Sequence, residues 1–91
     1  MLLGLKLKIT HLLRDKKELS MRELFSSHIK LGDAYKLHDL ISNLDHEVIY
    51  LNFDKITVLD INFFRVLKDL SGENYSKIKY VNMPETFKRY I

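Results

Sequence analysis

The clearest structural signal in this chain is the segment VIYLNFDKITVLDINFFRVLKDL, which spans residues 48–70. Its first six residues, 48–53, are rich in β-branched and aromatic side chains and show no clean alternation. Burial on both faces is the usual reason for such a run, which predicts a central strand. A polar turn at Asp54–Lys55 follows, and residues 56–59 are typical of a second, shorter strand.

The helical half of this segment begins at Asp60, whose carboxylate can accept hydrogen bonds from the free N–H groups of a first turn. Beyond Asp60, apolar residues recur at intervals of four and three, which predicts one buried stripe. The stripe consists of Phe63, Leu67 and Leu70, with Val66 beside it. Gly72 suits the left-handed conformation that commonly follows a helix end, so the helix is expected to stop there.

On the N-terminal side, a second helix is predicted after Gly32, with Asp33 as its cap. Its apolar stripe comprises Ala34, Leu37, Ile41 and Leu44, with Leu40 alongside. Further upstream, residues 5–10 alternate as an edge strand. Residues 11–20 are typical of a charged loop or a frayed helix, and residues 21–31 of a short helix or turn.

On the C-terminal side, residues 73–77 are expected to form a loop and residues 78–81 a strand. A last helix follows, opened either by Asn82 with Glu85 in capping-box spacing or by Pro84 at the first helical position. Its apolar residues Phe87, Tyr90 and Ile91 are expected to pack inward.

Strands that alternate with helices indicate an α/β fold: a small mixed sheet of about four strands with helices packed on it. At 91 residues the chain has room for a single domain, 1–91. The absence of cysteine excludes disulfides, thiolate metal sites and thiol nucleophiles. No segment reaches the about 20 apolar residues that a membrane span needs, nor does the start resemble a signal peptide, so a cytoplasmic protein is expected.

The charge is distributed unevenly along the chain. Residues 1–30 carry a net charge of +4, residues 31–76 of −4, and residues 77–91 of +3. If the two basic ends meet in space, they form a cationic patch that could steer an anionic partner, although solvated lysines that keep a small protein in solution explain the same pattern.

The order of strand, polar turn, short strand, Asp and apolar helix over residues 48–70 resembles the core of a STAS domain, the fold of anti-sigma factor antagonists. The chain is more similar still to a STAS-like family of unknown function in small bacterial proteins. That family opens its helical regions with a Ser-Arg pair and a Ser-Phe-like pair, and here Ser27–His28 and Asn62–Phe63 stand in these positions. The resemblance covers residues 23–91 and includes the last strand and helix. It implies a STAS-like fold in a bacterial or phage protein.

The sequence departs from the regulated members of the family at the start of this helix. In anti-sigma factor antagonists, the residue after the Asp is a serine that a partner kinase phosphorylates. Here that residue is Ile61, which has no hydroxyl group, and the amide of Asn62 cannot replace it. Phe63 stands where a glycine normally follows. Switching by phosphorylation at this position is therefore not expected.

The resemblance implies a non-enzymatic module for protein interaction or regulation, because related domains bind partners around this helix start. Ile61, Arg65 and Lys68 point away from the predicted stripe, and Phe64 lies on its flank. An exposed Ile beside a flanking Phe is unfavourable unless a partner, a second copy or the N-terminal segment covers it. The expected partner-binding surface comprises Asp54, Lys55, Asp60, Ile61, Asn62, Phe64, Arg65 and Lys68.

The alternative is a small nucleic-acid-binding protein that uses its basic ends, with Tyr80 and Tyr90 as stacking residues. The phosphate contacts would be Lys6, Lys8, Arg14, Lys16, Lys17, Lys79, Lys88 and Arg89. A third hypothesis, an enzyme whose site is assembled on a homodimer, has no sequence motif to carry it.

We expect no cofactor, metal or catalytic group. His38 and His46 lie eight residues apart, whereas a pair of metal ligands on a helix needs a spacing of three or four. The serines beside His28, at positions 26 and 27, lack a third catalytic group and are expected to form local turn hydrogen bonds. The carboxylates of Asp54 and Asp60 flank a short strand and do not form a recognisable acid–base pair.

Overall fold

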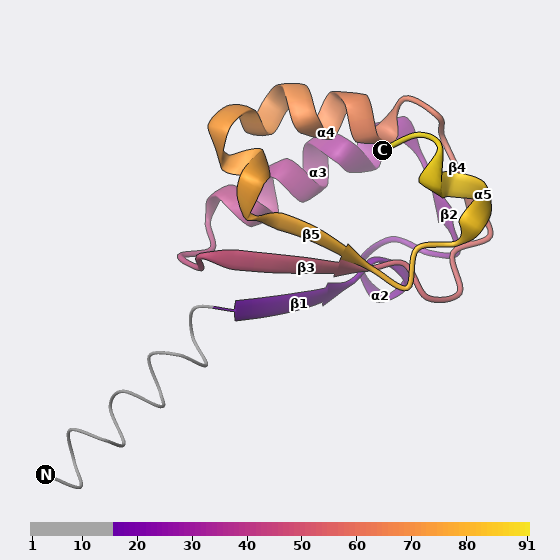
Figure 1. The fold of residues 1–91 in the computed structure, drawn as a ribbon, viewed down its shortest axis with the longest axis horizontal. Coiled ribbons are helices and arrows are strands. Elements are labelled where there is room, and N and C mark those ends of the chain that lie inside the picture. The colour runs from indigo at the N-terminus through magenta and orange to yellow at the C-terminus, as the bar shows by residue number, and fades with distance from the viewer. Residues whose placement is uncertain (1–15) are drawn as a thin grey trace, which may run out of the picture.

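Two small sheets of parallel strands and two long helices dominate residues 16–91, the part of the chain that the computed structural model describes (Figure 1). The larger sheet has the strand order β1-β3-β5, with both pairings parallel. Its strands are β1 (Lys16–Ser20), β3 (Val48–Asn52) and β5 (Ile78–Val81). The smaller sheet pairs β2 (His28–Ile29) with β4 (Val58–Leu59), also in parallel.

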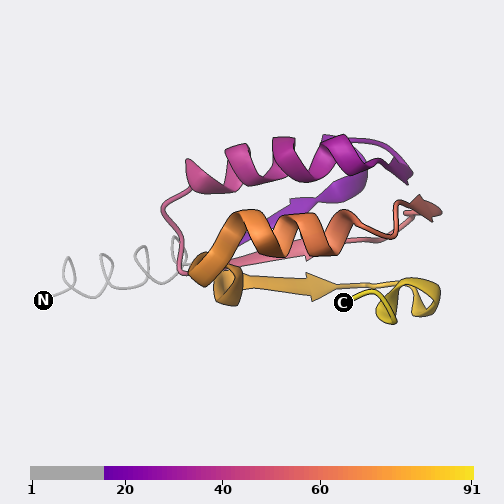
Figure 2. The same cartoon turned by 90° about the horizontal axis from the view of Figure 1, so that it is seen from above.

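The helices α3 (Leu31–Ser42) and α4 (Phe63–Ser71) lie side by side over the same face of the larger sheet (Figures 1 and 2). Three shorter helical segments complete the described chain: α2 (Met21–Leu24), the 3₁₀ helix η1 (Gly72–Lys77) and α5 (Glu85–Lys88). The fold is mixed α/β as expected, but the strands are divided between two sheets of three and two strands. None of the helices within residues 16–91 is long and apolar enough to cross a membrane.

The central position of β3 confirms the strand predicted at residues 48–53, although its burial differs from the expectation. Ile49 and Leu51 are buried against the helices, whereas Val48, Tyr50 and Asn52 are half-buried on the opposite face. Because α3 and α4 lie on one side of the larger sheet, β3 alternates between covered and partly open positions. The prediction of burial on both faces was wrong.

The strand β1 replaces the charged loop or frayed helix expected at residues 11–20, as far as the described residues 16–20 go. Leu19 is the single buried residue of β1, so the sequence has no apolar alternation from which this strand could be predicted. β2 was also missed, because it is two residues long with one of them buried. The short helix expected between residues 21 and 31 is α2, and the edge strand expected at residues 5–10 lies outside the described residues.

Helix α3 begins earlier than predicted. Lys30 is its N-terminal cap residue, and Asp33 is its third helical residue. The Asp33 carboxylate still closes the helix start, because its Oδ2 accepts a hydrogen bond from the Lys30 N–H at 2.9 Å. The apolar stripe is confirmed: Ala34 and Leu37 are buried, and Leu40, Ile41 and Leu44 pack against the core.

Helix α4 buries a different face from the one predicted. Phe63 and Leu67 are buried as expected, but Phe64 takes the place of Leu70, which is 36% exposed. The Phe64 ring lies among three aromatic rings, with centroids 5.7 Å from Phe53, 5.4 Å from Phe63 and 5.2 Å from Tyr80. This aromatic cluster joins α4 to β5 and to the loop that follows β3. The helix ends at Gly72 as predicted, and its φ of 56° is positive, but its ψ of −128° lies outside the left-handed helical region that was expected.

The C-terminal segment follows neither of the two helix starts proposed for it. Pro84 precedes α5 as its cap residue, and Asn82 adopts a φ of 54°. The Asn82 side chain donates a hydrogen bond to Asn52 Oδ1 at 3.1 Å, and Asn82 lies two residues before the cap position of α5. The strand at residues 78–81 and the burial of Phe87 are confirmed, whereas Tyr90 and Ile91 are exposed and residues 73–77 form part of η1.

Candidate interaction surface

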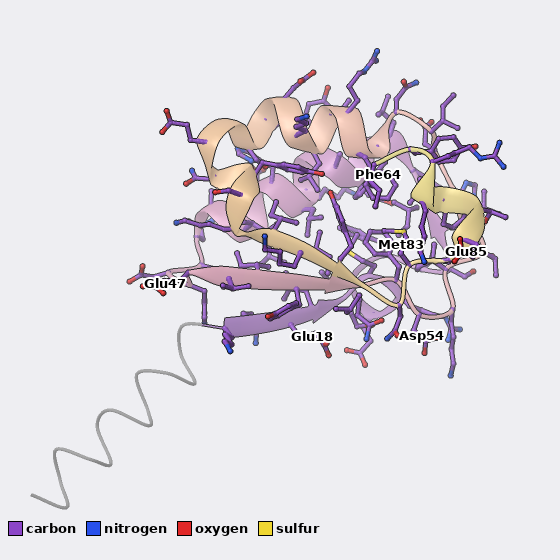
Figure 3. All side chains as sticks on the ribbon, viewed as in Figure 1. Glu18, Glu47, Asp54, Phe64, Met83 and Glu85 are labelled. Atoms are coloured by element: carbon purple, nitrogen blue, oxygen red, sulfur yellow. The ribbon has the colours of Figure 1, made fainter. Side chains whose placement is uncertain are left out.

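The turn at Asp54–Lys55 lies apart from the start of α4. Both side chains are exposed, and Lys55 has a φ of 64°. The Asp54 N–H donates to Asn52 Oδ1 at 2.9 Å, which ties the turn to the end of β3. Asp54 and Lys55 line an open hollow with residues of β1 and α2. Figure 3 shows Asp54 at the lower edge of the molecule, away from Phe64 beneath α4.

The residues Asp60, Ile61 and Asn62 form the turn that leads from β4 into α4. Asp60 Oδ1 accepts a hydrogen bond from the Asn62 N–H at 2.8 Å, and the Asp60 carbonyl accepts one from the Phe63 N–H at 3.0 Å. Asp60 therefore holds the turn that leads into α4, but the cap residue of the helix is Asn62, not Asp60 as predicted. Ile61 lies between these two anchored residues and is 60% exposed.

The remaining three residues of the predicted surface lie on α4 and do not share one environment. Arg65 and Lys68 are exposed, and Lys68 Nζ lies 5.9 Å from the centroid of the Tyr75 ring. Phe64 is 2% exposed and belongs to the aromatic cluster. Its prediction as a surface residue was wrong, because the rings of Phe53 and Tyr80 draw it into the core.

Exposed apolar residues that were not predicted as part of the surface join Ile61 at this end of the molecule. The exposed set, here called the helix-start patch, comprises Leu31, Tyr35, Val58 and Ile61. Tyr35 was expected to point away from the core. None of Leu31, Tyr35 and Val58 was assigned a function. The sequence could have indicated the exposure of Leu31, because this apolar residue lies at the start of an amphipathic helix but does not belong to its apolar stripe.

The pairing of β2 with β4 brings the two helix starts together. His28 pairs with Val58 and Ile29 with Leu59, and the Asp60 N–H donates to the Ile29 carbonyl at 3.0 Å. The two segments leave the smaller sheet next to each other, one into α3 and one into α4 (Figure 1). Residues separated by thirty positions in the sequence therefore contribute to the same end of the molecule.

The exposed charges around the helix-start patch are mainly basic. Three basic residues are exposed here: Lys30 directly before α3, Lys36 on α3 and Arg65 on α4. Asp39 is also exposed, one helical turn beyond Tyr35 and Lys36 on α3. The two acidic residues at the helix starts themselves are engaged in turns: Asp33 is 8% exposed and bonded to the Lys30 N–H, and Asp60 is half-buried and bonded to the Asn62 N–H. Their charges are therefore less available to a partner than those of the basic residues.

A hollow of about 280 Å³ adjoins the helix-start patch between α2, β2 and the first turns of α3. Leu24 and Phe25 contribute apolar surface, while His28, Lys30 and Lys36 contribute basic groups. The hollow, here called the basic hollow, is lined by Leu24, Phe25, Ser26, His28, Lys30, Asp33 and Lys36. Ser26 Oγ accepts a hydrogen bond from the His28 N–H and donates one to the His28 carbonyl, both at 3.0 Å. This confirms the turn role expected for Ser26.

A second cavity, of about 90 Å³, lies where α3 and α4 end. It is lined by His38, Ile41, Ser42, Leu44, His46, Ile49, Ser71, Asn74 and Lys77. His46 Nδ1 is buried without a hydrogen-bond partner among the described residues. No group of three or more His, Asp or Glu residues within 16–91 is arranged to hold a metal ion.

The tyrosines that were considered for nucleic-acid stacking lie in different environments. Tyr80 is half-buried in the aromatic cluster, and its hydroxyl lies 2.6 Å from that of Tyr75. Burial raises the pKa of Tyr80 far above its ordinary value, and the hydrogen bond with Tyr75 raises it further. Three aromatic rings already contact Tyr80, while Tyr90 is exposed, with the Arg89 guanidinium 5.9 Å from its ring centroid. The basic residues Lys6, Lys8 and Arg14 lie outside the described residues.

Searches against protein-family models, curated proteins and solved structures found no match to this chain. Any assignment of function therefore depends on the residues of the helix-start patch and on the physical chemistry of their surroundings.

Proposed function

We propose that this protein is a non-enzymatic interaction or regulatory module that binds a protein partner through the helix-start patch. The observation that carries the proposal is the 60% exposure of Ile61 between two anchored residues at the start of α4. Val58 is 49% and Tyr35 53% exposed at the same end of the molecule. Single exposed apolar residues are ordinary, but a group of them gathered at one end marks an interaction site.

The local structure favours recognition rather than chemistry. The carboxylates of Asp33 and Asp60 and the hydroxyl of Ser26 accept hydrogen bonds from nearby backbone N–H groups. These polar groups therefore stabilise the helix starts and a turn. The turn around Ile61 is fixed by two hydrogen bonds, and a partner that binds it does not have to order a loop first. Preorganisation of this kind lowers the entropic cost of association.

The arrangement of β3, a polar turn, β4, Asp60 and α4 supports the further proposal that the domain is STAS-like. In that comparison Ile61 stands where regulated members carry the phosphorylated serine. The proposed module binds its partner through an apolar contact at this position and is not switched there by phosphorylation.

The proposal is tested with full-length Ile61→Asp and Arg65→Glu variants, and Leu70→Asp provides a matched control. Leu70 lies on the same helix and is also exposed, but at the other end. We expect a specific partner cross-linked to the wild-type chain to be lost from Ile61→Asp and weakened in Arg65→Glu, while Leu70→Asp retains it. Each variant is first shown to be folded by its circular dichroism. If folded Ile61→Asp and Arg65→Glu chains keep every partner, the proposal is abandoned.

A further inference from the structure

We propose that the basic hollow receives an acidic, apolar segment of the partner protein. The inference rests on the proposed function, because the basic hollow borders the helix-start patch: Lys30 directly precedes Leu31, and Lys36 directly follows Tyr35. It adds the chemistry of the partner, namely carboxylate side chains next to an apolar one.

The floor of the basic hollow is apolar and held in place. Leu24 is exposed and Phe25 half-buried, so both offer surface to a ligand. The Phe25 N–H donates to the Met21 carbonyl at 2.9 Å, and Ser20 Oγ accepts from the Glu23 N–H at 3.2 Å. These bonds close α2 at both ends. An apolar side chain entering the hollow therefore meets a floor that is already formed.

The walls of the basic hollow select for negative charge. Lys30 and Lys36 are exposed, and His28 adds a third nitrogen-bearing side chain. Asp33 is the one acidic residue of the lining, and its Oδ2 already accepts the Lys30 N–H. Carboxylates of a partner would be steered to the two lysines, and a basic partner would be repelled.

The same electrostatic argument ranks the possible occupants. Residues 1–15 of this chain carry three basic residues, Lys6, Lys8 and Arg14, against one acidic residue, Asp15. Like charge therefore disfavours this segment as the occupant. The phosphates of a nucleic acid would satisfy the lysines but would gain nothing from Leu24 and Phe25. A protein segment with both carboxylate and apolar side chains matches the whole lining.

The experiment uses displayed random peptides as the probe and the full-length chain as the target. Peptides are selected on the wild-type chain and then measured on a Lys30→Glu/Lys36→Glu variant, on Ile61→Asp and on a control variant. The control is Lys79→Glu, an exposed lysine on β5 that does not line the hollow. We expect the selected peptides to carry Asp or Glu beside an apolar residue. They should bind the double variant at least about tenfold more weakly, and Lys79→Glu with unchanged affinity.

Two further measurements test the inference, and the first of them does not depend on the folding of the double variant. On the wild-type chain, the affinity of the selected peptides should fall with added salt. In the folded double variant, peptides with Lys in place of Asp or Glu should recover binding. Recovery would show that charge pairing, rather than a change in the fold, explains the loss.

The outcomes separate failure of this inference from failure of the proposed function. Neutral or basic peptides that need Ile61 but ignore Lys30 and Lys36 would overturn the inference and leave the proposed function standing. Absence of any peptide that depends on Ile61 or on the two lysines would overturn both. A single-stranded oligonucleotide that displaces the selected peptides would identify phosphate as the ligand, and lysine-dependent self-association of the chain would identify a second copy. Either of these results also overturns the inference.

Discussion

Truncation of Phe64 should lower the free energy of unfolding strongly, whereas truncation of Ile61, three residues earlier, should leave it almost unchanged. Phe64 is 2% exposed and contacts three aromatic rings, whereas Ile61 is 60% exposed. Removing a buried Phe ring costs about 3–5 kcal/mol of the free energy of unfolding, because transfer energy and a residual cavity both count. The stability expected for a chain of this length is about 5–14 kcal/mol, so Phe64→Ala removes a large part of it.

The more informative variant is Phe64→Leu, which keeps most of the volume and should cost about 1–2 kcal/mol. Ile61→Ser should change the free energy of unfolding by less than about 0.5 kcal/mol, because the side chain is largely in water in both states. The assay is urea unfolding followed by circular dichroism. The comparison is valid when the free energy of unfolding depends on urea concentration with the same slope in the wild type and in each variant. The reasoning is refuted if Ile61→Ser costs as much as Phe64→Leu, because Ile61 would then be part of the core of the full-length chain.

Three other changes test the local structure. Burial raises the pKa of Tyr80, and its hydrogen bond with Tyr75 adds to this, so the phenol stays neutral in the fold while the unfolded chain ionises above about pH 10. The free energy of unfolding of the wild-type chain should therefore fall by up to about 1.4 kcal/mol per pH unit above that point. Tyr80→Phe lacks this ionisable group, so the free energy of unfolding of the wild type should fall relative to that of the variant. Parallel pH profiles of the two chains in urea unfolding would contradict this. Gly72 has a φ of 56° and a ψ of −128°, a conformation that residues other than glycine rarely adopt, so Gly72→Ala should cost about 1–3 kcal/mol, and a neutral result would exclude backbone strain. Lys55 has a φ of 64°, so Lys55→Gly should raise the free energy of unfolding by up to about 1 kcal/mol, whereas a marked loss would show that the Lys55 side chain has a structural role.

The elements that the sequence predicted correctly are those in which burial repeats along the segment itself. The stripe of α3 and the apolar run of β3 have this property, and both were found. The strands β1 and β2 lack it, because β1 buries Leu19 alone and β2 buries Ile29 alone. Their existence depends on parallel pairing with β3 and β4, which lie about thirty residues further along the chain. Such long-range pairing leaves no local period to read.

The buried face of α4 shows why the candidate surface was only partly predictable. Two consecutive phenylalanines at its start fit either of two helical faces, one that continues through Leu70 and one that includes Phe64. Spacing alone cannot choose between these faces, because each repeats at three or four residues. The choice is made by Phe53 on the loop after β3 and by Tyr80 on β5, whose rings lie against Phe64. Exposure of Ile61, in contrast, was predicted because Ile61 points away from the apolar stripe, and it is 60% exposed.

The charge of the candidate surface could not be read from the sequence at all. Residues 31–76 carry a net charge of −4, which predicts an acidic middle. Two of their carboxylates, those of Asp33 and Asp60, hold the two helix starts and are shielded from solvent to different extents. Glu47 lies at the opposite end of the molecule (Figure 3). The exposed basic residues beside the helix-start patch are Lys30, Lys36 and Arg65, and one exposed acidic residue, Asp39, lies a helical turn beyond Lys36 on α3. A partner therefore meets a basic surface on a segment whose total charge is acidic, which makes an acidic ligand the discriminating probe of this site.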